Sequence, residues 1–250
     1  MKFKLANLKK IKMVIEAMDQ LIDDVTFTVT KTGFKANALE KSGSSFISID
    51  WAKADFLVFE AEEKEEFSFK IKDIKTAIRR TKGDEEVEIE IGDFLILKTK
   101  DKNAITTHTI PLLSEELFNT QKSYPGLEFN IKVDLSSDRF KEIIESLEDY
   151  SMSFEIFLEA DKLIIGTYEA GKKIKHEIKE GPNLVISSES REKETTRSAF
   201  STDIIKRFLS PSKYTERTTI QWSKDYPIIV NYSIPNLTVT FLSAPRIESE

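Results

Sequence analysis

The 250-residue chain contains no cysteine and only two histidines. The absence of cysteine excludes disulfide bonds and metal sites built on thiolates. His108 and His176 each lie in a segment with the alternation of a β-strand, and neither has companions that would complete a catalytic triad. A lone strand histidine is typical of a structural role, so these two residues indicate no nucleophilic or acid–base centre.

Long apolar runs are also missing. No segment approaches the roughly 18–20 apolar residues that a membrane span requires. The first ten residues, MKFKLANLKK, lack the apolar core of a signal peptide. Hydrophobic residues make up 40% of the chain and charged residues 32%. These proportions predict a soluble, intracellular protein with enough apolar material for two compact domains of about 125 residues each.

The motifs of common catalytic sites are absent as well. The sequence has no phosphate loop of the GxxxxGK(S/T) kind, no HExxH and no GxSxG. Glu62–Glu66 and Asp84–Glu86 are acidic runs, but successive like charges are typical of solvated loops, and a metal needs converging ligands. We therefore predict a protein that is not an enzyme and binds no metal or cofactor. A metal-dependent nuclease that uses the acidic runs is the enzymatic alternative.

The formal net charge is −6 at pH 7. A uniformly acidic surface repels the phosphates of nucleic acid. That repulsion no longer excludes nucleic acid if the positive charges gather on one face, so the distribution of charge matters more than the total.

What the sequence does contain is an internal repeat. Asn7–Ile22 and Ile71–Arg80 have the spacing of amphipathic helices, and both patterns recur as Ser137–Tyr150 and Thr202–Leu209. A strand–turn–strand pattern also recurs, with Phe27, Val29, Phe34 and Ala36 in the first half and Ile156, Leu158, Leu163 and Ile165 in the second. Each recurrence comes about 130 residues later, which predicts a duplicated unit.

Strands dominate the rest of each half. Val87, Ile89 and Ile91 alternate with glutamates, the pattern of a half-buried strand, and Ile228–Phe241 reads as a closing hairpin. Few helices on many antiparallel strands indicate an α+β fold rather than a doubly wound α/β fold. We predict an N-terminal domain at 1–110, a connector at 111–127 and a C-terminal domain at 128–250. The connector has prolines near both ends and several large apolar residues, which favours a functional role.

Three of the four predicted helices have mixed or basic exposed faces. The first buries a stripe from Ile11 to Ile22, the second buries Ile71, Ile74 and Ile78, and the fourth buries Ile204, Ile205 and Phe208. The third helix differs. Its stripe of Phe140, Ile143, Ile144 and Leu147 leaves an acidic opposite face, formed by Asp138, Glu142, Glu145 and Asp149.

Four segments of the chain are informative as a set: NLKKIKMVIEAMDQLID, IPLLSEEL, TRSAFSTDIIKRFL and the C-terminal DYPIIVNYSIPNLTVTFLSAPRIESE. They resemble the proliferating cell nuclear antigen (PCNA) family of sliding clamps, archaeal type. The C-terminal segment is similar to the end of that family, and NLKKIKMVIEAMDQLID is similar to its first helix. IPLLSEEL resembles the entry into its interdomain connector, and TRSAFSTDIIKRFL resembles its final helix. The resemblance covers the whole chain in order, spacing and length.

The resemblance implies a ring-forming, duplicated clamp fold in which helices line a hole and antiparallel sheets form the outside. The function implied is that of a DNA sliding clamp, a processivity factor that encircles duplex DNA and tethers the replicative polymerase. The implied partners are double-stranded DNA without sequence preference, DNA polymerase, flap nuclease and DNA ligase through short peptide motifs, a clamp-loader ATPase, and other copies in a trimer. The location would be the archaeal cytoplasm at the nucleoid, or the nucleus in a eukaryote.

The resemblance also assigns residues to three surfaces. The implied DNA-facing residues are Lys9, Lys12, Lys72, Arg79, Arg80, Lys141, Lys206 and Arg207, with Lys10 and Lys141 at the margins of the hole. The implied pocket for partner peptides consists of Leu39, Phe46, Leu117, Phe118, Tyr124, Pro227, Leu242, Ala244 and Pro245. The implied subunit-interface residues are Ile105, Thr107 and Thr109 on the edge strand 104–110, and Ile174, His176 and Ile178 on the edge strand 173–179.

The sequence departs from the family pattern at two places. The segment Leu39–Phe46 has an apparent insertion and lacks the histidine usual in that loop, and Ser243 stands where an apolar residue commonly precedes the alanine. Both places belong to the implied peptide pocket. The acidic third helix is a further departure. A specialised subunit of a heterotrimeric or checkpoint-type ring therefore remains an alternative to a homotrimeric clamp.

Overall fold

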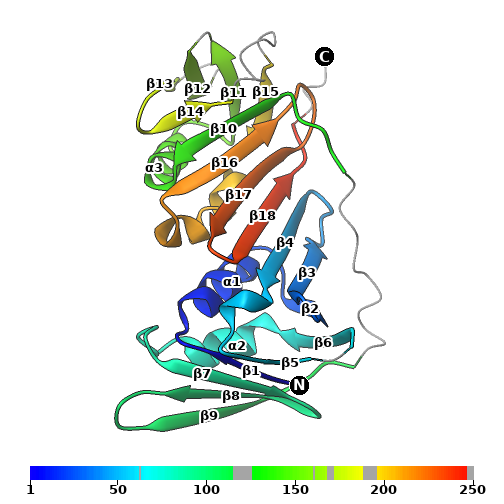
Figure 1. The fold of residues 1–250 in the computed structure, drawn as a ribbon. Coiled ribbons are helices and arrows are strands. Elements are labelled where there is room, and N and C mark those ends of the chain that lie inside the picture. The colour runs from blue at the N-terminus through cyan, green and yellow to red at the C-terminus, as the bar shows by residue number, and fades with distance from the viewer. Residues whose placement is uncertain (62, 115–125, 160, 168–171, 188–195, 247–250) are drawn as a thin grey trace. The chain divides into compact units, whose positions relative to one another are not determined.

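The computed structural model describes residues 1–250 apart from 62, 115–125, 160, 168–171, 188–195 and 247–250 (Figure 1). The chain divides into two compact units. Unit 1 comprises Met1–Lys41, Phe46–Tyr124 and Ile234–Val239, and unit 2 comprises Ser42–Ser45, Pro125–Ser233 and Thr240–Glu250. Unit 1 thus includes the turn of the last hairpin, which a division of the chain at one connector does not anticipate.

Unit 1 consists of antiparallel strands in two groups. One sheet has the order β5-β1-β7-β8-β9, and the other group has the order β4-β3-β2-β6. The bounds are β1 Lys2–Leu5, β2 Asp24–Thr30, β3 Gly33–Leu39, β4 Ser45–Ala52, β5 Val58–Glu60, β6 Glu65–Lys70, β7 Glu86–Ile91, β8 Phe94–Lys100 and β9 Ile105–Pro111.

Two helices and one short 3-10 helix complete the described part of unit 1: α1 Lys9–Asp19, η1 Lys53–Asp55 and α2 Ile71–Ile78. Their apolar stripes face inward as the sequence predicts. α1 buries Ile11, Val14 and Ile15 among others, and α2 buries Ile71 and Ile74. Residues three and four apart lie on one face of a helix, and this apolar face packs against the strands. The two helices contact each other.

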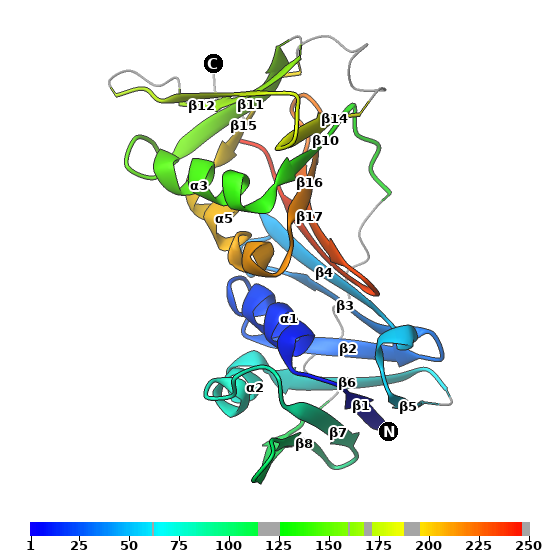
Figure 2. The same cartoon turned by 60° about the vertical axis from the view of Figure 1, so that its left-hand side comes forward.

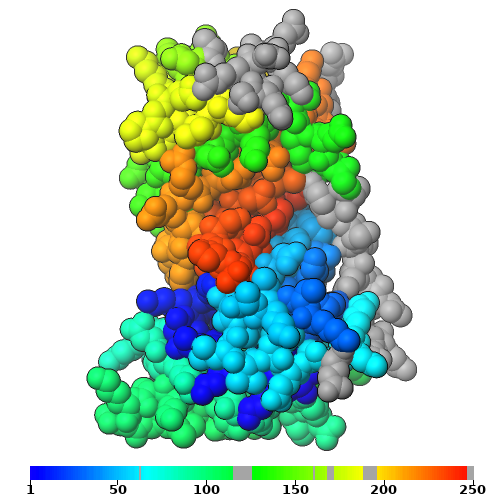
Figure 3. All heavy atoms as spheres, viewed as in Figure 1, coloured from blue at the N-terminus to red at the C-terminus, as the bar shows by residue number. Residues whose placement is uncertain are grey.

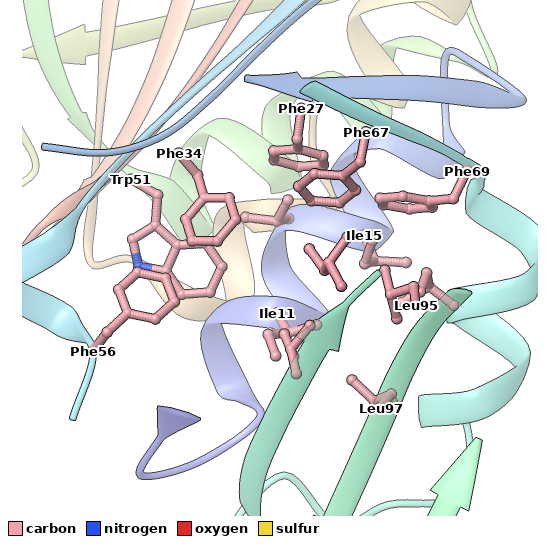
Figure 4. Close-up of a pocket in the computed structure, with 14 residues that line it drawn as sticks. Ile11, Ile15, Phe27, Phe34, Trp51, Phe56, Phe67, Phe69, Leu95 and Leu97 are labelled. Carbon is pink, nitrogen blue, oxygen red and sulfur yellow. The ribbon is translucent and has the colours of Figure 1, made fainter. Parts of the chain in front are cut away.

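Aromatic rings fill much of the core of unit 1. Phe27 stacks on Phe69 with ring centroids 5.8 Å apart, and Phe3 meets Phe34 edge to face at 4.6 Å. An apolar cavity of about 60 Å³ lies among these side chains, between α1 and the strands (Figure 4). Every residue that lines it is apolar, for example Trp51.

Unit 2 repeats the plan of unit 1. One sheet has the order β13-β12-β11-β15, and the other strands follow the order β14-β10-β16-β17-β18. The bounds are β10 Ile131–Ser136, β11 Ser153–Glu159, β12 Lys162–Gly166, β13 Lys175–Lys179, β14 Leu184–Ile186, β15 Ser198–Ser201, β16 Arg217–Trp222, β17 Ile228–Ile234 and β18 Leu237–Ser243. The helical elements are α3 Ser137–Leu147, α5 Thr202–Arg207 and the 3-10 helix η3 Ser210–Tyr214.

The helices of unit 2 lie side by side on one face of its strands (Figure 2). α3 begins after Ser136, whose hydroxyl accepts a hydrogen bond from the backbone N–H of Arg139 at 3.5 Å. The stripe predicted for α3 is fully buried, and Phe208 after α5 stacks on Phe241 with centroids 4.7 Å apart. The apolar spacing of each helix therefore fixes which face it turns to the core.

The strand registers confirm the internal repeat. In unit 1, Val29 of β2 pairs with Phe34 of β3, and in unit 2, Leu158 of β11 pairs with Leu163 of β12. The four predicted helices are present in the described residues, two in each unit, although α1 is shorter than predicted and starts at Lys9. All described strand pairs within the units are antiparallel, so the predicted α+β class is confirmed.

The strands that end a sheet are β5, β6 and β9 in unit 1 and β13, β14 and β15 in unit 2, and the predicted subunit edges are β9 and β13. β9 is the last strand in the sheet of unit 1, and β13 is the last strand in the sheet of unit 2. The spheres of β8 and β9 form the outer margin of unit 1 (Figure 3). A terminal strand presents backbone N–H and C=O groups that its own sheet does not use.

Gly33 at the turn between β2 and β3 provides a test of the fold. Its φ is +150°, and a Cβ atom there would lie 2.1 Å from the carbonyl oxygen of Trp51. We expect Gly33→Ala to lower the free energy of unfolding by about 1–3 kcal/mol through backbone strain. Gly92→Ala is the matched control, because a Cβ atom there meets nothing within 4 Å. Chemical denaturation of both variants measures the effect, and equal midpoints would contradict the turn geometry.

Candidate nucleic-acid interface, partner pocket and edge strands

The cationic side chains predicted to face DNA differ in whether they already bind an acceptor within the protein. On α1, the ammonium group of Lys9 lies 3.3 Å from a carboxylate oxygen of Asp84, and both side chains are largely exposed. The ammonium group of Lys12 donates a hydrogen bond to the carbonyl oxygen of Thr81. An exposed ion pair of the first kind is worth little and can be exchanged for a phosphate.

Lys10, predicted at the margin of the hole, is held inside unit 1. Its ammonium group pairs with Asp55 and donates to the carbonyl oxygen of Pro235 at 2.7 Å. Only 20% of its side chain is exposed. This lysine ties α1 to η1 and to the turn of the last hairpin.

Three cationic side chains on α2 or directly after it are exposed and can bind an anion. Lys72, Arg79 and Arg80 take part in no hydrogen bond or ion pair among the described residues. Lys75 on the same helix is different, because it pairs with Asp19 of α1. Among the predicted DNA-facing cations of unit 1, those at α2 are therefore the ones that have no acceptor to give up before they bind a phosphate.

In unit 2, several cationic side chains on or near the helices pair with carboxylates of the same unit. Arg139 pairs with Glu142 at 3.1 Å, and Lys141 lies 3.9 Å from Glu145 on the same helix. Lys206 of α5 pairs with Glu148 after α3, and this hydrogen bond raises the pKa of Lys206. The acidic face predicted for α3 is therefore partly compensated within the unit, and Arg207 remains exposed beside it.

The predicted peptide-pocket residues fall in both units. Leu39 of β3 pairs with Phe46 of β4 in unit 1, and Phe46 is buried. Leu242 and Ala244 belong to unit 2, where the backbone N–H of Ala244 donates to the carbonyl oxygen of Ser44 at 2.9 Å. Pro227 and Pro245 also belong to unit 2 and are half-buried. Leu117, Phe118 and Tyr124 lie outside the described residues.

Five of the six predicted interface residues lie on the edge strands β9 and β13. On β9, Ile105, Thr107 and Thr109 are exposed, and 65% of Ile105 is accessible. Their neighbours Thr106 and His108 point the other way and line a hollow beside α2. The exposed row of β9 is thus on the face of the sheet that lies away from the helices.

On β13 the predicted residues point toward the helices. The imidazole Nε2 of His176 lies 2.8 Å from the hydroxyl of Ser146 on α3, and Ile178 is buried in its own unit. Burial and the charge of Arg139 lower the pKa of His176. Ile174 precedes β13, which begins at Lys175, and is half-buried. The side chains of His176 and Ile178 therefore pack within unit 2, and the edge of β13 presents mainly its backbone.

No catalytic constellation emerges from the described part of the chain. It holds no group of three or more acidic or histidine side chains placed to bind a metal ion. The cavity in unit 1 is lined by apolar side chains alone and supplies no reactive group. No helix in the described ranges is both long and apolar enough to cross a membrane.

Comparisons with known proteins point in one direction. Residues 1–117 match the family model described as proliferating cell nuclear antigen, N-terminal domain. A DNA polymerase sliding clamp of Nanoarchaeum equitans is 28% identical over 243 residues, covering 95% of this chain and 96% of that protein. A DNA polymerase sliding clamp of Methanococcus vannielii is 25% identical over 251 residues, covering 97% of this chain and 98% of the relative.

The fold agrees with these relatives. The crystal structure of proliferating cellular nuclear antigen from Entamoeba histolytica superposes with a TM-score of 0.89, covers 98% of both chains and is 16% identical in sequence. That likeness establishes the two-domain clamp fold. Together with the match of residues 1–117 to the N-terminal-domain model and the full-length similarity to named clamps, it shows that this chain resembles the proliferating cell nuclear antigen family of sliding clamps over its whole length.

Proposed function

We propose that this chain is a DNA sliding clamp, a processivity factor that encircles duplex DNA and tethers the replicative polymerase. The observation that carries the proposal is the full-length similarity to proteins named DNA polymerase sliding clamp, on the same two-domain fold. We further propose that the protein acts by binding alone, without catalysis or a cofactor, in the archaeal cytoplasm.

The charge pattern supports non-specific contact with DNA. The net charge of −6 does not oppose this, because a closed ring holds DNA by its topology and needs little attraction. Contacts from lysine and arginine to phosphates position a protein on DNA without reading bases, which permits sliding. We propose that Lys72, Arg79 and Arg80 are the main contacts of unit 1, since their side chains are exposed on α2 or directly after it and have no partner among the described residues.

The remaining cations are proposed as weaker DNA contacts. Lys9, Lys12, Lys141 and Lys206 each lie near an oxygen acceptor in their own unit. A phosphate must compete with that acceptor, so each contributes less than a free cation of the same exposure. Arg207 is exposed and is proposed as a further contact.

We propose that the ring is a trimer of this chain joined through β9 and β13, and that a clamp-loader ATPase opens it. Both strands end their sheets, as such a junction requires. A specialised subunit of a heterotrimeric or checkpoint-type ring is the second candidate. The acidic face of α3 favours it, because three copies would otherwise bring this face close to the same DNA.

Retention on DNA tests the proposed function directly. We expect the protein, loaded onto nicked circular plasmid, to remain bound in high salt and to leave when the plasmid is cut, because a ring slides off a free end. Gel filtration of labelled protein with plasmid before and after linearisation measures this. Equal loss from circular and linear DNA would show an ordinary DNA-binding protein instead.

The same assay separates topology from charge. Lys72→Glu combined with Arg79→Glu should keep the protein on circular DNA while reducing stimulation of the polymerase and the salt dependence of loading, by roughly one unit of salt slope for each lost contact. Lys10→Gln is the matched control, since Lys10 is bound to Asp55. If the double variant loads and stimulates like the wild type, α2 does not face the DNA.

Partner peptides provide a second test. We propose that polymerase, flap nuclease and ligase bind through motifs of the form Q-x-x-(I/L/M)-x-x-aromatic-aromatic in the predicted pocket. A few buried anchors dominate such interfaces. Leu117→Ala combined with Phe118→Ala should therefore weaken the binding of such a peptide at least about tenfold. Isothermal titration calorimetry measures the affinities, and equal values for both proteins would place the binding site elsewhere.

A further inference from the structure

The apolar cavity of unit 1 is a feature that the proposed clamp function does not use (Figure 4). Its volume is about 60 Å³, and its lining comes from α1, α2 and both groups of strands in unit 1. Ile15 and Ile74 line it from the two helices, and Phe27 and Leu97 line it from the two groups of strands. All four side chains are buried, so the cavity lies in the core of the unit.

The lining offers no hydrogen-bond partner to water. Among the residues that form it, Trp51 alone carries a polar side-chain atom, and its indole N–H donates a hydrogen bond to Asp55 at 2.7 Å. Asp55 is not part of the lining, and its carboxylate also pairs with Lys10. A buried water usually makes about three hydrogen bonds, and an apolar cavity stays dry even where a water would fit by volume. The cavity of unit 1 therefore excludes water.

Aromatic rings account for the space that remains. Phe27 stacks on both Phe67 and Phe69, with ring centroids 5.9 Å and 5.8 Å away, and Phe34 stacks on Phe56 at 5.2 Å. A planar ring cannot bend into an irregular gap as the flexible side chain of methionine does. Rings that already pack against one another therefore leave a space that none of them can fill.

The internal repeat shows that these rings are particular to unit 1. The pairing of β2 with β3 corresponds to the pairing of β11 with β12, which places Ile156 at the position of Phe27 and Leu163 at the position of Phe34. Both aliphatic residues are fully buried. The duplicated fold is thus built with aliphatic side chains at these two positions in unit 2, so the aromatic lining is not a requirement of the fold.

The volume of the cavity limits what it can hold. In another protein, an apolar cavity of about 150 Å³ lined by leucine, isoleucine and phenylalanine stays dry and binds benzene or xenon. The cavity of unit 1, at about 60 Å³, is less than half as large. By that comparison it suits a molecule of roughly one to three heavy atoms. Such a molecule would supply the dispersion contacts that the lining side chains lack across an empty space.

We propose that the cavity of unit 1 is a binding site for one small apolar molecule, of the size of a xenon atom or a short hydrocarbon such as ethane. The site is separate from the predicted DNA-facing, partner and subunit surfaces, and the proposal does not depend on the clamp function. A molecule bound there stabilises the folded state, because the unfolded chain has no cavity. Since α1 and α2 both line the cavity, the bound molecule packs against the helices that carry the predicted DNA-facing cations of unit 1.

Xenon is the probe that tests the site by location. In crystals pressurised with xenon, we expect anomalous density for one xenon atom inside unit 1, among Phe27, Trp51 and Leu97. Val14→Ile adds one methylene group at a lining residue and should remove this density, because the added group takes up part of the space. Val185→Ile is the matched control: it makes the same change at an exposed residue of β14, so it should bind xenon like the wild type.

Thermal unfolding tests the same site in solution. Xenon or ethane should raise the unfolding midpoint of the wild type more than helium at equal pressure does, and the rise should be at least about twofold smaller for Val14→Ile. Leu97→Ala should enlarge the cavity, so that benzene raises the midpoint of this variant and leaves that of the wild type unchanged. If Leu97→Ala does not fold, the measurements with xenon and ethane decide alone.

Three results would overturn the inference. One is the absence of xenon density from the cavity of the wild type, even if xenon binds elsewhere on the protein. Another is ordered water in the cavity of crystals that hold no xenon, because the space is then not an apolar site. The third is equal xenon binding by the wild type and a folded Val14→Ile variant, which would place the site outside the lining described above.

Discussion

The free edges of β9 and β13 are the constraint from which the rest of this structure is best understood. Each strand ends a sheet, and its outward N–H and C=O groups find no partner in that sheet. Open edges are sites at which chains join, and soluble proteins usually block them. Here the row of side chains on β13 that faces α3 is packed in the core, while its backbone edge is left for another strand. A chain with one such edge in each of two units can join its neighbours on both sides.

The distribution of charge is consistent with the proposed ring around DNA. The helices α1, α3 and α5 pair most of their lysines with acceptors in the same unit, whereas Lys72 and Arg79 at α2 have no partner among the described residues. Weak and exchangeable contacts are what a sliding protein needs, because a strong attraction would fix it at one place on the DNA.

Much of the fold could be predicted from the sequence because it depends on local periodicity. The stripe of α3 and the strand turn at Gly33 are visible in single windows of the chain, and the repeat follows from comparing windows. The ends of helices are harder to predict. α1 starts at Lys9, whose backbone N–H donates a hydrogen bond to the side-chain oxygen of Asn7.

The partner that each charged side chain binds could not be predicted from the sequence in the same way. Lys206 meets Glu148, and Lys10 meets Asp55 and Pro235, through contacts between distant segments. Nothing in a helical pattern reveals such partners, because they depend on which elements pack together. For the same reason the sequence groups Arg80 with Arg79, although in the structure only Arg79 also lines the hollow beside α1.

In the proposed ring, β9 and β13 of successive copies join and close around DNA. Because the chain has no cysteine, Thr107→Cys on β9 and Glu177→Cys on β13 would provide the only thiols, both on the side of their strands away from the helices. We expect a short bis-maleimide reagent to link the double variant into a closed trimer, and we expect this trimer to stay on circular plasmid in denaturant until the plasmid is cut. Monomer bands alone, or a linked trimer that denaturant strips from circular plasmid, would contradict it.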